Sequence, residues 1–151
     1  MGYIMDLRKI VGHQTLLMPA AGVVIGDGLG NVLLQQRKDD KTWANHGGSI
    51  ELDEKVEDAL VREVKEELGI TINEFKLLNI YSGPAYHNIY PNGDEVSIID
   101  ITYYCHKFEG EFILQEDEVI QVKWFNKDSL PENIHHNSKQ ALLDYFELLN
   151  K

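Results

Sequence analysis

Apolar residues recur at helical spacing between residues 56 and 68, at Val56, Ala59, Leu60, Val64 and Leu68. Steps of three and four residues place them on one stripe, so the pattern predicts an amphipathic helix packed on the core. Glu63 and Glu67 lie on the same stripe, where a buried helix face normally carries apolar side chains. Because an unpaired buried carboxylate is costly, we expect a positive group to meet these two.

The residues that flank this stripe predict where the helix begins and ends. Asp53 is the expected N-cap, and Glu54 and Glu57 follow in the first turn, where negative charge favours a helix start. Gly69 directly follows the last stripe residue and predicts the C-terminal stop.

Further apolar segments predict strands on both sides of this helix. Strands are expected at residues 16–25, 32–37, 75–81, 96–108 and 119–126, and a second amphipathic helix at 138–149, capped by Ser138 or Asn137. Residues 82–95 carry no pattern of their own, which is typical of a functional or mobile loop. Strands interrupted by one helix and closed by another predict an α/β fold with a mixed β-sheet between helices.

Length and charge limit the classes of protein and partner that the sequence is compatible with. At 151 residues the chain is expected to form a single domain, residues 1–151. The net charge of −11 argues against a polynucleotide or an anionic membrane as partner, because both attract positive surfaces. The sequence has neither a membrane-length apolar segment nor a signal-peptide pattern, so we expect a soluble cytoplasmic protein. Cys105, the single cysteine, lies in an apolar run and is expected to be a buried structural thiol.

A third carboxylate joins the two on the helix stripe. Glu66 lies three residues from Glu63 and beside Glu67, so the three fall within about one helical turn and repel one another. A hard divalent cation, which prefers oxygen ligands, would relieve that repulsion. Such an ion also reverses the local sign of the field, so a small anionic substrate is compatible with the negative chain.

The sequence around the predicted helix resembles the Nudix box. Gly48 is followed by five residues, Glu54, seven residues and the segment Arg62-Glu63-Val64-Lys65-Glu66-Glu67-Leu68-Gly69-Ile70, which agrees with the box at each defined position. The similarity extends more loosely over residues 18–126, and the two ends of the chain carry no assigned motif. It implies an α/β/α sandwich and a hydrolase of phosphoric anhydride bonds that requires Mg²⁺ or Mn²⁺. Many relatives have proline where this chain has His46, a departure that concerns the shape of the loop.

The resemblance also implies roles for the box residues. Glu63 and Glu67 are the leading metal ligands, and Glu66 is a further one, directly or through water. The flexible backbone at Gly48 lets a carbonyl oxygen reach the metal. Arg62 belongs with Glu63 and Glu67 in the catalytic set, because its donors hold the carboxylates in place.

Residues outside the helix complete the expected site. Glu118, with Glu116 as the alternative, is the candidate general base, because an acidic loop at this place resembles a segment that often supplies one in the family. The expected substrate-binding residues are Arg37, Gly47, Gly48 and Tyr86. Tyr81 and Tyr90 lie in or beside the same loop as Tyr86 and are alternative stacking partners for a base.

Together these features predict an enzyme that cleaves the diphosphate linkage of a nucleoside diphosphate joined to another moiety, of the ADP-ribose, nucleotide-sugar or dinucleoside polyphosphate type. In the family, a proline after the box suggests ADP-ribose-type substrates and a tyrosine suggests dinucleoside polyphosphates. Pro84 and Tyr86 fit both patterns approximately, so they do not distinguish between these substrates. Two alternatives stay open: a nucleoside triphosphate pyrophosphohydrolase that sanitises the nucleotide pool, and a module that senses nucleotide without turnover. The expected partner is a small-molecule nucleotide, and a homodimer formed through the chain ends is left open.

Overall fold

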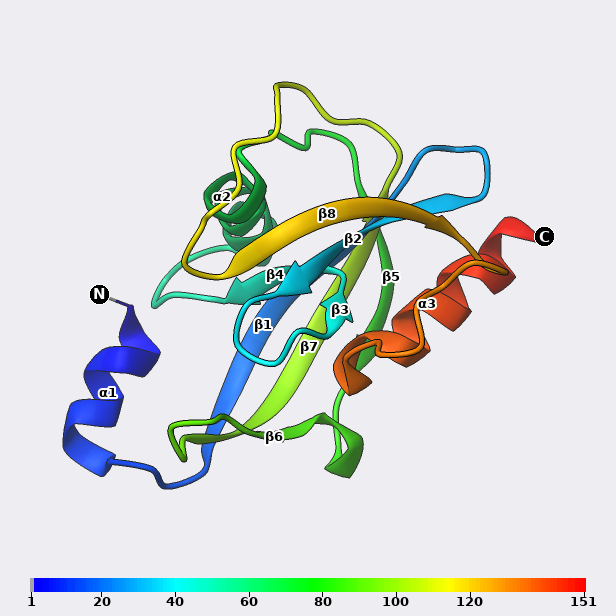
Figure 1. Cartoon of the computed structure of the whole chain (residues 1–151). Helices are drawn as coiled ribbons and strands as arrows, with labels where there is room; N and C mark the ends of the chain where they lie inside the picture. Colours follow the sequence, from blue (N-terminus) through cyan, green and yellow to red (C-terminus); the bar gives the residue numbers. More distant parts are fainter. Residues whose placement is uncertain (1) are drawn as a thin grey trace.

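The computed structural model describes residues 2–151, which form a mixed β-sheet with helices on both faces (Figure 1). The strands are β1 (Leu16–Gly26), β2 (Asn31–Arg37), β3 (Trp43–Ala44), β4 (His46–Ser49), β5 (Lys76–Tyr81), β6 (His87–Ile89), β7 (Glu95–Cys105) and β8 (Val119–Asn126). The helices are α1 (Tyr3–Val11), α2 (Val56–Leu68), α3 (His136–Leu149) and the short 3₁₀ helix η1 (Pro84–Tyr86). The predicted α/β/α sandwich is confirmed.

The sheet is built around one long parallel pair. The strand order is β3-β2-β1-β7-β5, and β4, β6 and β8 pair with β1, β7 and β2. β1 and β7 run parallel from Leu16 opposite Val96 to Ile25 opposite Cys105, whereas their other pairings are antiparallel. On its other edge, β1 pairs with β4 through residues 20–23 and with β2 through residues 25–26. The two strands thus share one edge of β1, and β4 lies beside α2.

Each face of the sheet has its own hydrophobic core. On one face α2 buries its apolar stripe, and Val64 lies in one cluster with Val23 of β1. On the other face α3 buries Leu142 and Tyr145 in a cluster with Val24. Successive side chains of β1 therefore pack into the cores on opposite faces of the sheet, because side chains alternate between the two faces along a strand.

The extent of α2 agrees with the prediction, but its start is capped differently. Gly69 ends the helix in the left-handed conformation, with φ of 77°. The prediction of Asp53 as N-cap was wrong, because the N-cap is Lys55 and Asp53 itself has φ of 61°. The turn before the helix is held instead by the Glu54 carboxylate, which accepts the backbone N–H of Glu51 at 3.0 Å.

The predicted cap of α3 was also wrong. His135 is the N-cap, and its Nδ1 accepts the backbone N–H of Asn137 at 3.1 Å. The expected caps, Asn137 and Ser138, lie in the first turn of the helix. The ring nitrogen of the buried His135 accepts the hydrogen bond that a capping oxygen usually accepts.

The segment at residues 82–95 has more structure than its sequence suggests. It contains η1 and β6, and β6 pairs with the start of β7. β7 itself ends at Cys105, three residues before the predicted end at 108. Cys105 is 2% exposed, which confirms a buried thiol, and burial raises its pKa to about 12.

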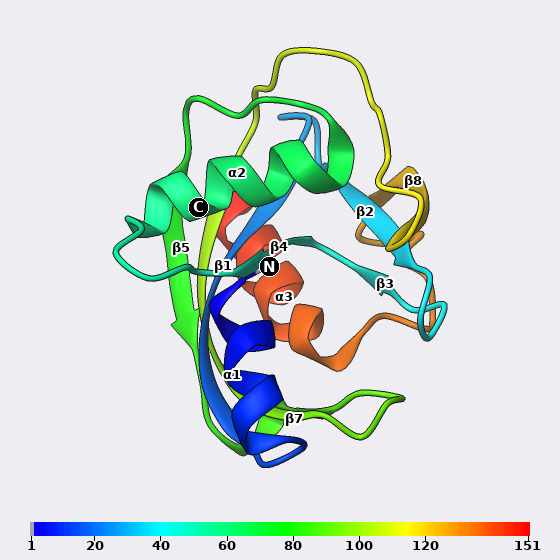
Figure 2. The same ribbon diagram turned by 90° about the vertical axis from the view of Figure 1, so that its left-hand side faces the viewer.

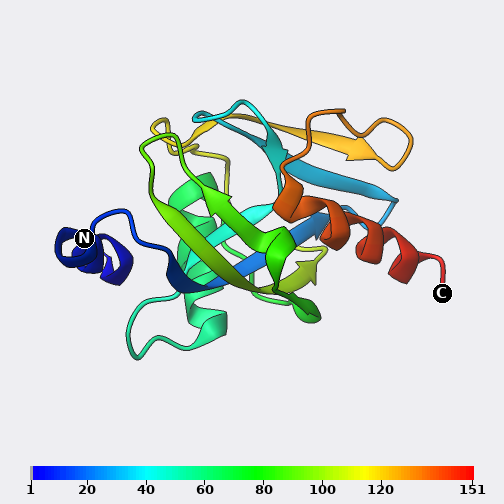
Figure 3. The same cartoon turned by 90° about the horizontal axis from the view of Figure 1, so that it is seen from below.

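Helix α1 lies in the N-terminal segment to which no motif was assigned. It is found on the same side of the molecule as α2 and below it in Figure 2. Figure 3 shows α1 and α3 at opposite ends of the molecule. Within residues 2–151, none of the helices has the length and apolar character needed to cross a bilayer.

Candidate active site

A pocket of about 460 Å³ lies between α2, α1 and the loop that precedes β8. Four separate parts of the chain bring predicted site residues to its lining: Arg37, Gly47, Gly48, Glu63, Glu67 and Glu118. The fold thus gathers six of the predicted site residues into one place, which we call the acidic pocket.

Glu67 is the most constrained of the carboxylates in the acidic pocket. Its side chain lies on the inner face of α2 and is 7% exposed. One carboxylate oxygen accepts the backbone N–H of Gly47 at 2.8 Å, and the other accepts Nε2 of Gln35 at 3.3 Å. Burial, together with the charges of Glu63 and Glu118, raises the pKa of Glu67 to about 8. The carboxylate therefore needs positive charge nearby if it is to be ionised at neutral pH.

Gln35 and His46 form a hydrogen-bonded chain that ends at Glu67, and no sequence pattern singled out Gln35. The Gln35 side-chain nitrogen lies 2.8 Å from Nδ1 of His46, and Nε2 of His46 lies 2.9 Å from the carbonyl oxygen of Leu33. A carbonyl can only accept, so His46 Nε2 carries the proton and Nδ1 accepts from Gln35. Burial lowers the pKa of His46 to about 4, which keeps the ring neutral. His46 thus replaces the proline of many relatives with a buried hydrogen-bonding group.

Arg62 binds the other acidic residues of the helix. Its Nε and Nη2 donate to the two oxygens of Glu54 at 2.8 and 2.9 Å, and Nη2 also donates to the Ser49 carbonyl at 3.1 Å. Nη1 donates to Glu63 at 2.9 Å and to Glu66 at 3.4 Å. The hydrogen bonds from Arg62 hold the pKa of Glu54 below its usual value. Arg62 therefore contacts three carboxylates at once.

Two glycines allow the backbone to pass close to the carboxylates. A Cβ at Gly48 would overlap the carboxyl group of Glu63, and a Cβ at Gly47 would overlap the Ala21 carbonyl oxygen. Gly47 also has φ of 144°, a conformation that side chains disfavour. Glycine is therefore required at Gly47 by both space and backbone geometry, whereas a side chain at Gly48 would displace the Glu63 carboxylate.

The remaining predicted residues differ in position. Glu118 lines the acidic pocket, whereas the side chain of Glu66 is 53% exposed on the Arg62 side of the helix. Arg37 lines the pocket and is paired with Asp39, its Nη2 lying 2.8 Å from the carboxylate.

Tyr86 is the predicted substrate residue that the fold places elsewhere. It is 7% exposed in the core beneath α3, stacked on Tyr81 with ring centroids 5.8 Å apart. Because its ring already packs against the core, it is not available to a ligand in the acidic pocket. Tyr90 lies in that pocket instead.

The acidic pocket has the donor chemistry of a divalent cation site. Within residues 2–151, no group of three His, Cys, Asp or Glu side chains is arranged closely enough to hold a metal ion. Glu63 is hydrogen-bonded to Arg62, and Glu67 is hydrogen-bonded to Gly47 and Gln35. The oxygens nevertheless suit a hard cation, since burial raises the pKa of Glu63 and of Glu67 and a cation would favour their ionised forms.

A second hollow of about 150 Å³, which we call the polar pocket, adjoins the acidic pocket. The two share Met18, Arg37, Gly47, Gly48 and Tyr90 in their linings. Asn45, Asp100, Asn137 and Ser138 line the polar pocket. The buried Oδ1 atom of Asn137 lacks a hydrogen-bond partner among the described residues, and burial raises the pKa of Asp100 to about 6. This end therefore offers hydrogen-bonding side chains to a ligand.

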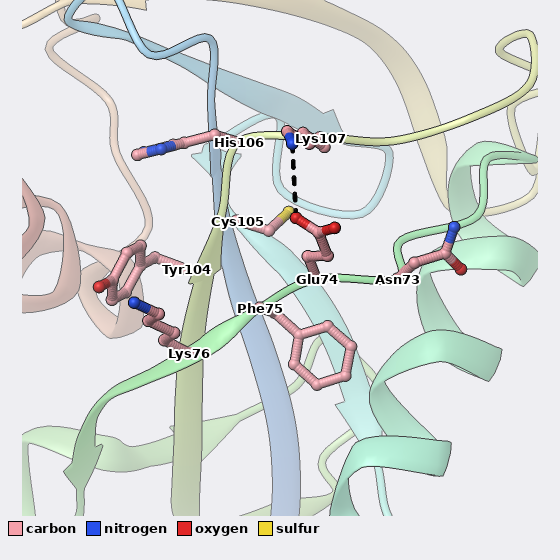
Figure 4. A pocket seen from close by; sticks show the side chains of 8 residues that line it. All are labelled: Asn73, Glu74, Phe75, Lys76, Tyr104, Cys105, His106 and Lys107. Atoms are coloured by element: carbon pink, nitrogen blue, oxygen red, sulfur yellow. Dashed lines mark ion pairs between the residues drawn. The ribbon is translucent and has the colours of Figure 1, made fainter.

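A third pocket, of about 600 Å³, lies away from the carboxylates between the start of β5 and the end of β7 (Figure 4). Its lining includes Lys76, Tyr104, Cys105 and the ion pair of Glu74 with Lys107 at 3.6 Å. The predicted site residues are absent from the lining of this third pocket, which is therefore a separate feature.

Comparison with known proteins agrees with this geometry. The chain matches the NUDIX domain over residues 16–146. It is 31% identical over 152 residues to a protein named ADP-ribose pyrophosphatase from Methanocaldococcus jannaschii, with 96% of this chain and 82% of the relative covered. It is 30% identical over 129 residues to "Uncharacterized Nudix hydrolase YfcD" from Salmonella typhi, covering 82% of this chain and 65% of the length of that relative.

The structures agree as well. The crystal structure of a MutT NUDIX hydrolase from Burkholderia pseudomallei superposes with a TM-score of 0.72 at 30% identity, covering 85% of this chain and 97% of the other. With the intact box in the acidic pocket, these matches show that the chain belongs to the Nudix hydrolase family.

Proposed function

We propose that this Nudix hydrolase cleaves the diphosphate linkage of a nucleoside diphosphate joined to another moiety. The observation that carries the proposal is the pair Glu63 and Glu67, held on the inner face of α2 in one pocket with Glu118. Nudix hydrolases generally need a divalent metal, and we propose Mg²⁺ or Mn²⁺ here. A divalent ion bound at these oxygens would neutralise phosphate charge and lower the cost of forming a hydroxide nucleophile.

Each protein residue would have a separate task in the reaction. Glu63 and Glu67 would hold the ion, with Glu66 reaching it through water, and Arg62 would keep the carboxylates aligned. Glu118 would accept the proton of the attacking water, because it lines the same pocket as Glu63 and Glu67 from the loop that precedes β8. Arg37 and the backbone at Gly47 and Gly48 would contact the phosphates.

The paired pockets favour a substrate with two unlike parts. The acidic pocket suits an ion-bound diphosphate, and the polar pocket, with the unpartnered Asn137 Oδ1, suits a neutral group rich in hydroxyls. Inorganic pyrophosphate would fill only the first. The name of the M. jannaschii relative, ADP-ribose pyrophosphatase, agrees with this shape of substrate.

A substrate panel read by product identity tests the proposal. The purified protein would be incubated with ADP-ribose, nucleotide sugars, dinucleoside polyphosphates and nucleoside triphosphates, with Mg²⁺, with Mn²⁺ or with EDTA. We expect metal-dependent release of a nucleoside monophosphate and a phosphorylated remainder. Release of pyrophosphate from triphosphates alone would replace the proposal by the nucleotide-sanitising alternative, and tight binding without turnover would favour a sensing module.

Variants locate the activity in the acidic pocket. Glu67→Gln should lower kcat by at least about 10²-fold, because it removes charge stabilisation from the reacting phosphates. The matched control is Asp58→Asn, which removes an exposed carboxylate from the same helix and should leave kcat unchanged. A near-normal rate for Glu67→Gln would remove Glu67 from the mechanism.

A further inference from the structure

Helix α1 contributes to the acidic pocket although it lies outside residues 16–146, the part of the chain that matches the Nudix domain. Two of its side chains, Ile4 and Met5, line the pocket together with Glu63 and Glu67. Figure 2 shows α1 and α2 one below the other on the same side of the molecule, so the pocket lies between an apolar helix face and an acidic one.

Specific hydrogen bonds fix α1 in this place. Near its start, the backbone N–H of Tyr3 donates to the carboxylate of Glu51 at 2.7 Å. Near its end, Nη1 of the buried Arg8 donates to the carbonyl oxygens of Gly12 and Gln14 at 3.0 and 2.6 Å. Nη2 of Arg8 also donates to the carbonyl oxygen of Glu95, the first residue of β7. The guanidinium thus joins the helix to the sheet, and the position of Ile4 and Met5 is set by the fold.

The side of the acidic pocket formed by α1 differs chemically from the rest of the lining. Ile4 has no hydrogen-bonding group and the Met5 thioether is only a weak acceptor, so neither side chain is suited to recognise a phosphate or a sugar hydroxyl. Met18 and Tyr90 lie in the same lining and add a flexible thioether and an aromatic ring. Such side chains pack well on the flat apolar face of a nucleobase, and they tolerate any of the bases because all present a π-face.

Met5 also has surface to offer a ligand. It is 48% exposed at the rim of the acidic pocket, and a planar group between α1 and Tyr90 would cover it. Ile10 on the same helix is 82% exposed but lies outside the pocket lining. The helix therefore carries both an apolar residue placed to contact a ligand and one that is not.

We propose that α1 is a nucleobase-binding wall, in which Ile4 and Met5 pack on the base of the substrate while its diphosphate lies against Glu63 and Glu67. The inference rests on the proposed function, since it assigns the base of that substrate to α1 and leaves the neutral polar part to the polar pocket. Specificity for a nucleoside would then come from a helix outside residues 16–146, which match the NUDIX domain.

Binding of product fragments tests this wall without turnover. Dissociation constants for the four nucleoside monophosphates and for ribose 5-phosphate, which lacks a base, would be measured by calorimetry with the full chain and Mg²⁺. For Ile4→Ala/Met5→Ala we expect the Kd of every nucleoside monophosphate to rise about tenfold, the effect of losing about 1.4 kcal/mol of apolar contact. The Kd of ribose 5-phosphate should stay within about twofold, because that ligand leaves the wall empty.

Matched variants separate contact from folding. Ile10→Ala removes the same side chain from α1 outside the pocket and should behave as the wild type in both measurements. The single variant Met5→Ala, at an exposed position, should show part of the double variant's effect even if Ile4→Ala loosens the helix.

Each other outcome overturns the inference. Unchanged affinity for the nucleoside monophosphates, equal weakening of ribose 5-phosphate, or a wild type that binds no nucleoside monophosphate would each show that α1 does not recognise a base. The substrate panel reports separately on hydrolysis, so an active wild type with unchanged Kd values in the α1 variants would refute the wall alone. An inactive wild type with base-dependent binding at α1 would refute the proposed function alone.

Discussion

Replacing Glu67 by glutamine should stabilise the metal-free protein at high pH while it removes activity. The side chain is 7% exposed, and burial raises its pKa to about 8 from an ordinary value of 4.5. In the unfolded chain Glu67 loses its proton near pH 4.5, whereas in the folded protein it keeps the proton until about pH 8. The folded state therefore holds the extra proton between these values, and its stability falls as the pH rises across them.

The size of the effect follows from the two pKa values. Each pH unit by which the pKa rises costs about 1.4 kcal/mol once the group is ionised, so the wild type loses up to about 5 kcal/mol between pH 4.5 and pH 9. Glutamine does not titrate and avoids this loss. It retains an oxygen to accept the Gly47 N–H, but its amide nitrogen faces that of Gln35, which costs about 1 to 2 kcal/mol.

The difference between the two proteins should accordingly change sign with pH. At pH 5 the wild type has already lost about 0.8 kcal/mol, so we expect Glu67→Gln to be at most about 1 kcal/mol less stable than the wild type there, and about 3 kcal/mol more stable at pH 9. Urea denaturation followed by circular dichroism in EDTA, from pH 5 to pH 9, gives both free energies of unfolding. Asp58→Asn serves as the control, because its exposed carboxylate should give a curve parallel to that of the wild type. If the Glu67→Gln curve is also parallel to the wild type, the buried carboxylate is ionised at no cost and the electrostatic argument fails.

Three further predictions concern the neighbours of Glu67. Arg62→Met should lower the free energy of unfolding at pH 7 by about 2 kcal/mol in urea denaturation, because Glu54 and Glu63 lose a partly exposed ionic partner; a loss below about 0.5 kcal/mol would contradict the positioning role. Gly48→Ala should raise the Mg²⁺ concentration needed for half-maximal activity about tenfold, since its Cβ displaces the Glu63 carboxylate, and an unchanged metal titration would count against that contact. Cys105 should react with Ellman's reagent at pH 8 only after unfolding in urea, because the thiol is buried and its pKa is about 12; fast reaction of the folded protein would show the thiol to be accessible.

Local periodicity explains which parts of the fold could be predicted. The apolar stripe of α2 and the stop at Gly69 depend on residues within a few turns of one another, and both are found in the structure. The parallel pairing of β1 with β7 joins Leu16 to Val96, and partners so distant in sequence leave no local pattern. Helix α1 was missed for a related reason, because its main anchor, Arg8, bonds to the Glu95 carbonyl and lies 3.7 Å from the carboxylate of Asp94, and both partners are distant in sequence.

The errors at the helix starts have a common physical cause. Preferred capping residues were present at both places, but the tertiary structure uses other groups. Before α2, Glu54 is held by Arg62 and by the Glu51 N–H, which shifts the first helical residue beyond Asp53. Before α3, the buried ring of His135 supplies the acceptor. Propensity identifies residues able to cap, whereas tertiary contacts decide which residue does.

The support of Glu67 shows why part of the site is visible only in three dimensions. His46 is buried and neutral, and its one ring proton is committed to the Leu33 carbonyl. Its other nitrogen must accept, so the Gln35 amide turns its nitrogen toward the ring, and the same nitrogen can then donate to Glu67. With the amide reversed, its oxygen would face the carboxylate and repel it. A hydrogen bond to a backbone carbonyl of β2 thereby determines, through two side chains, that a donor rather than an acceptor meets the buried carboxylate of α2.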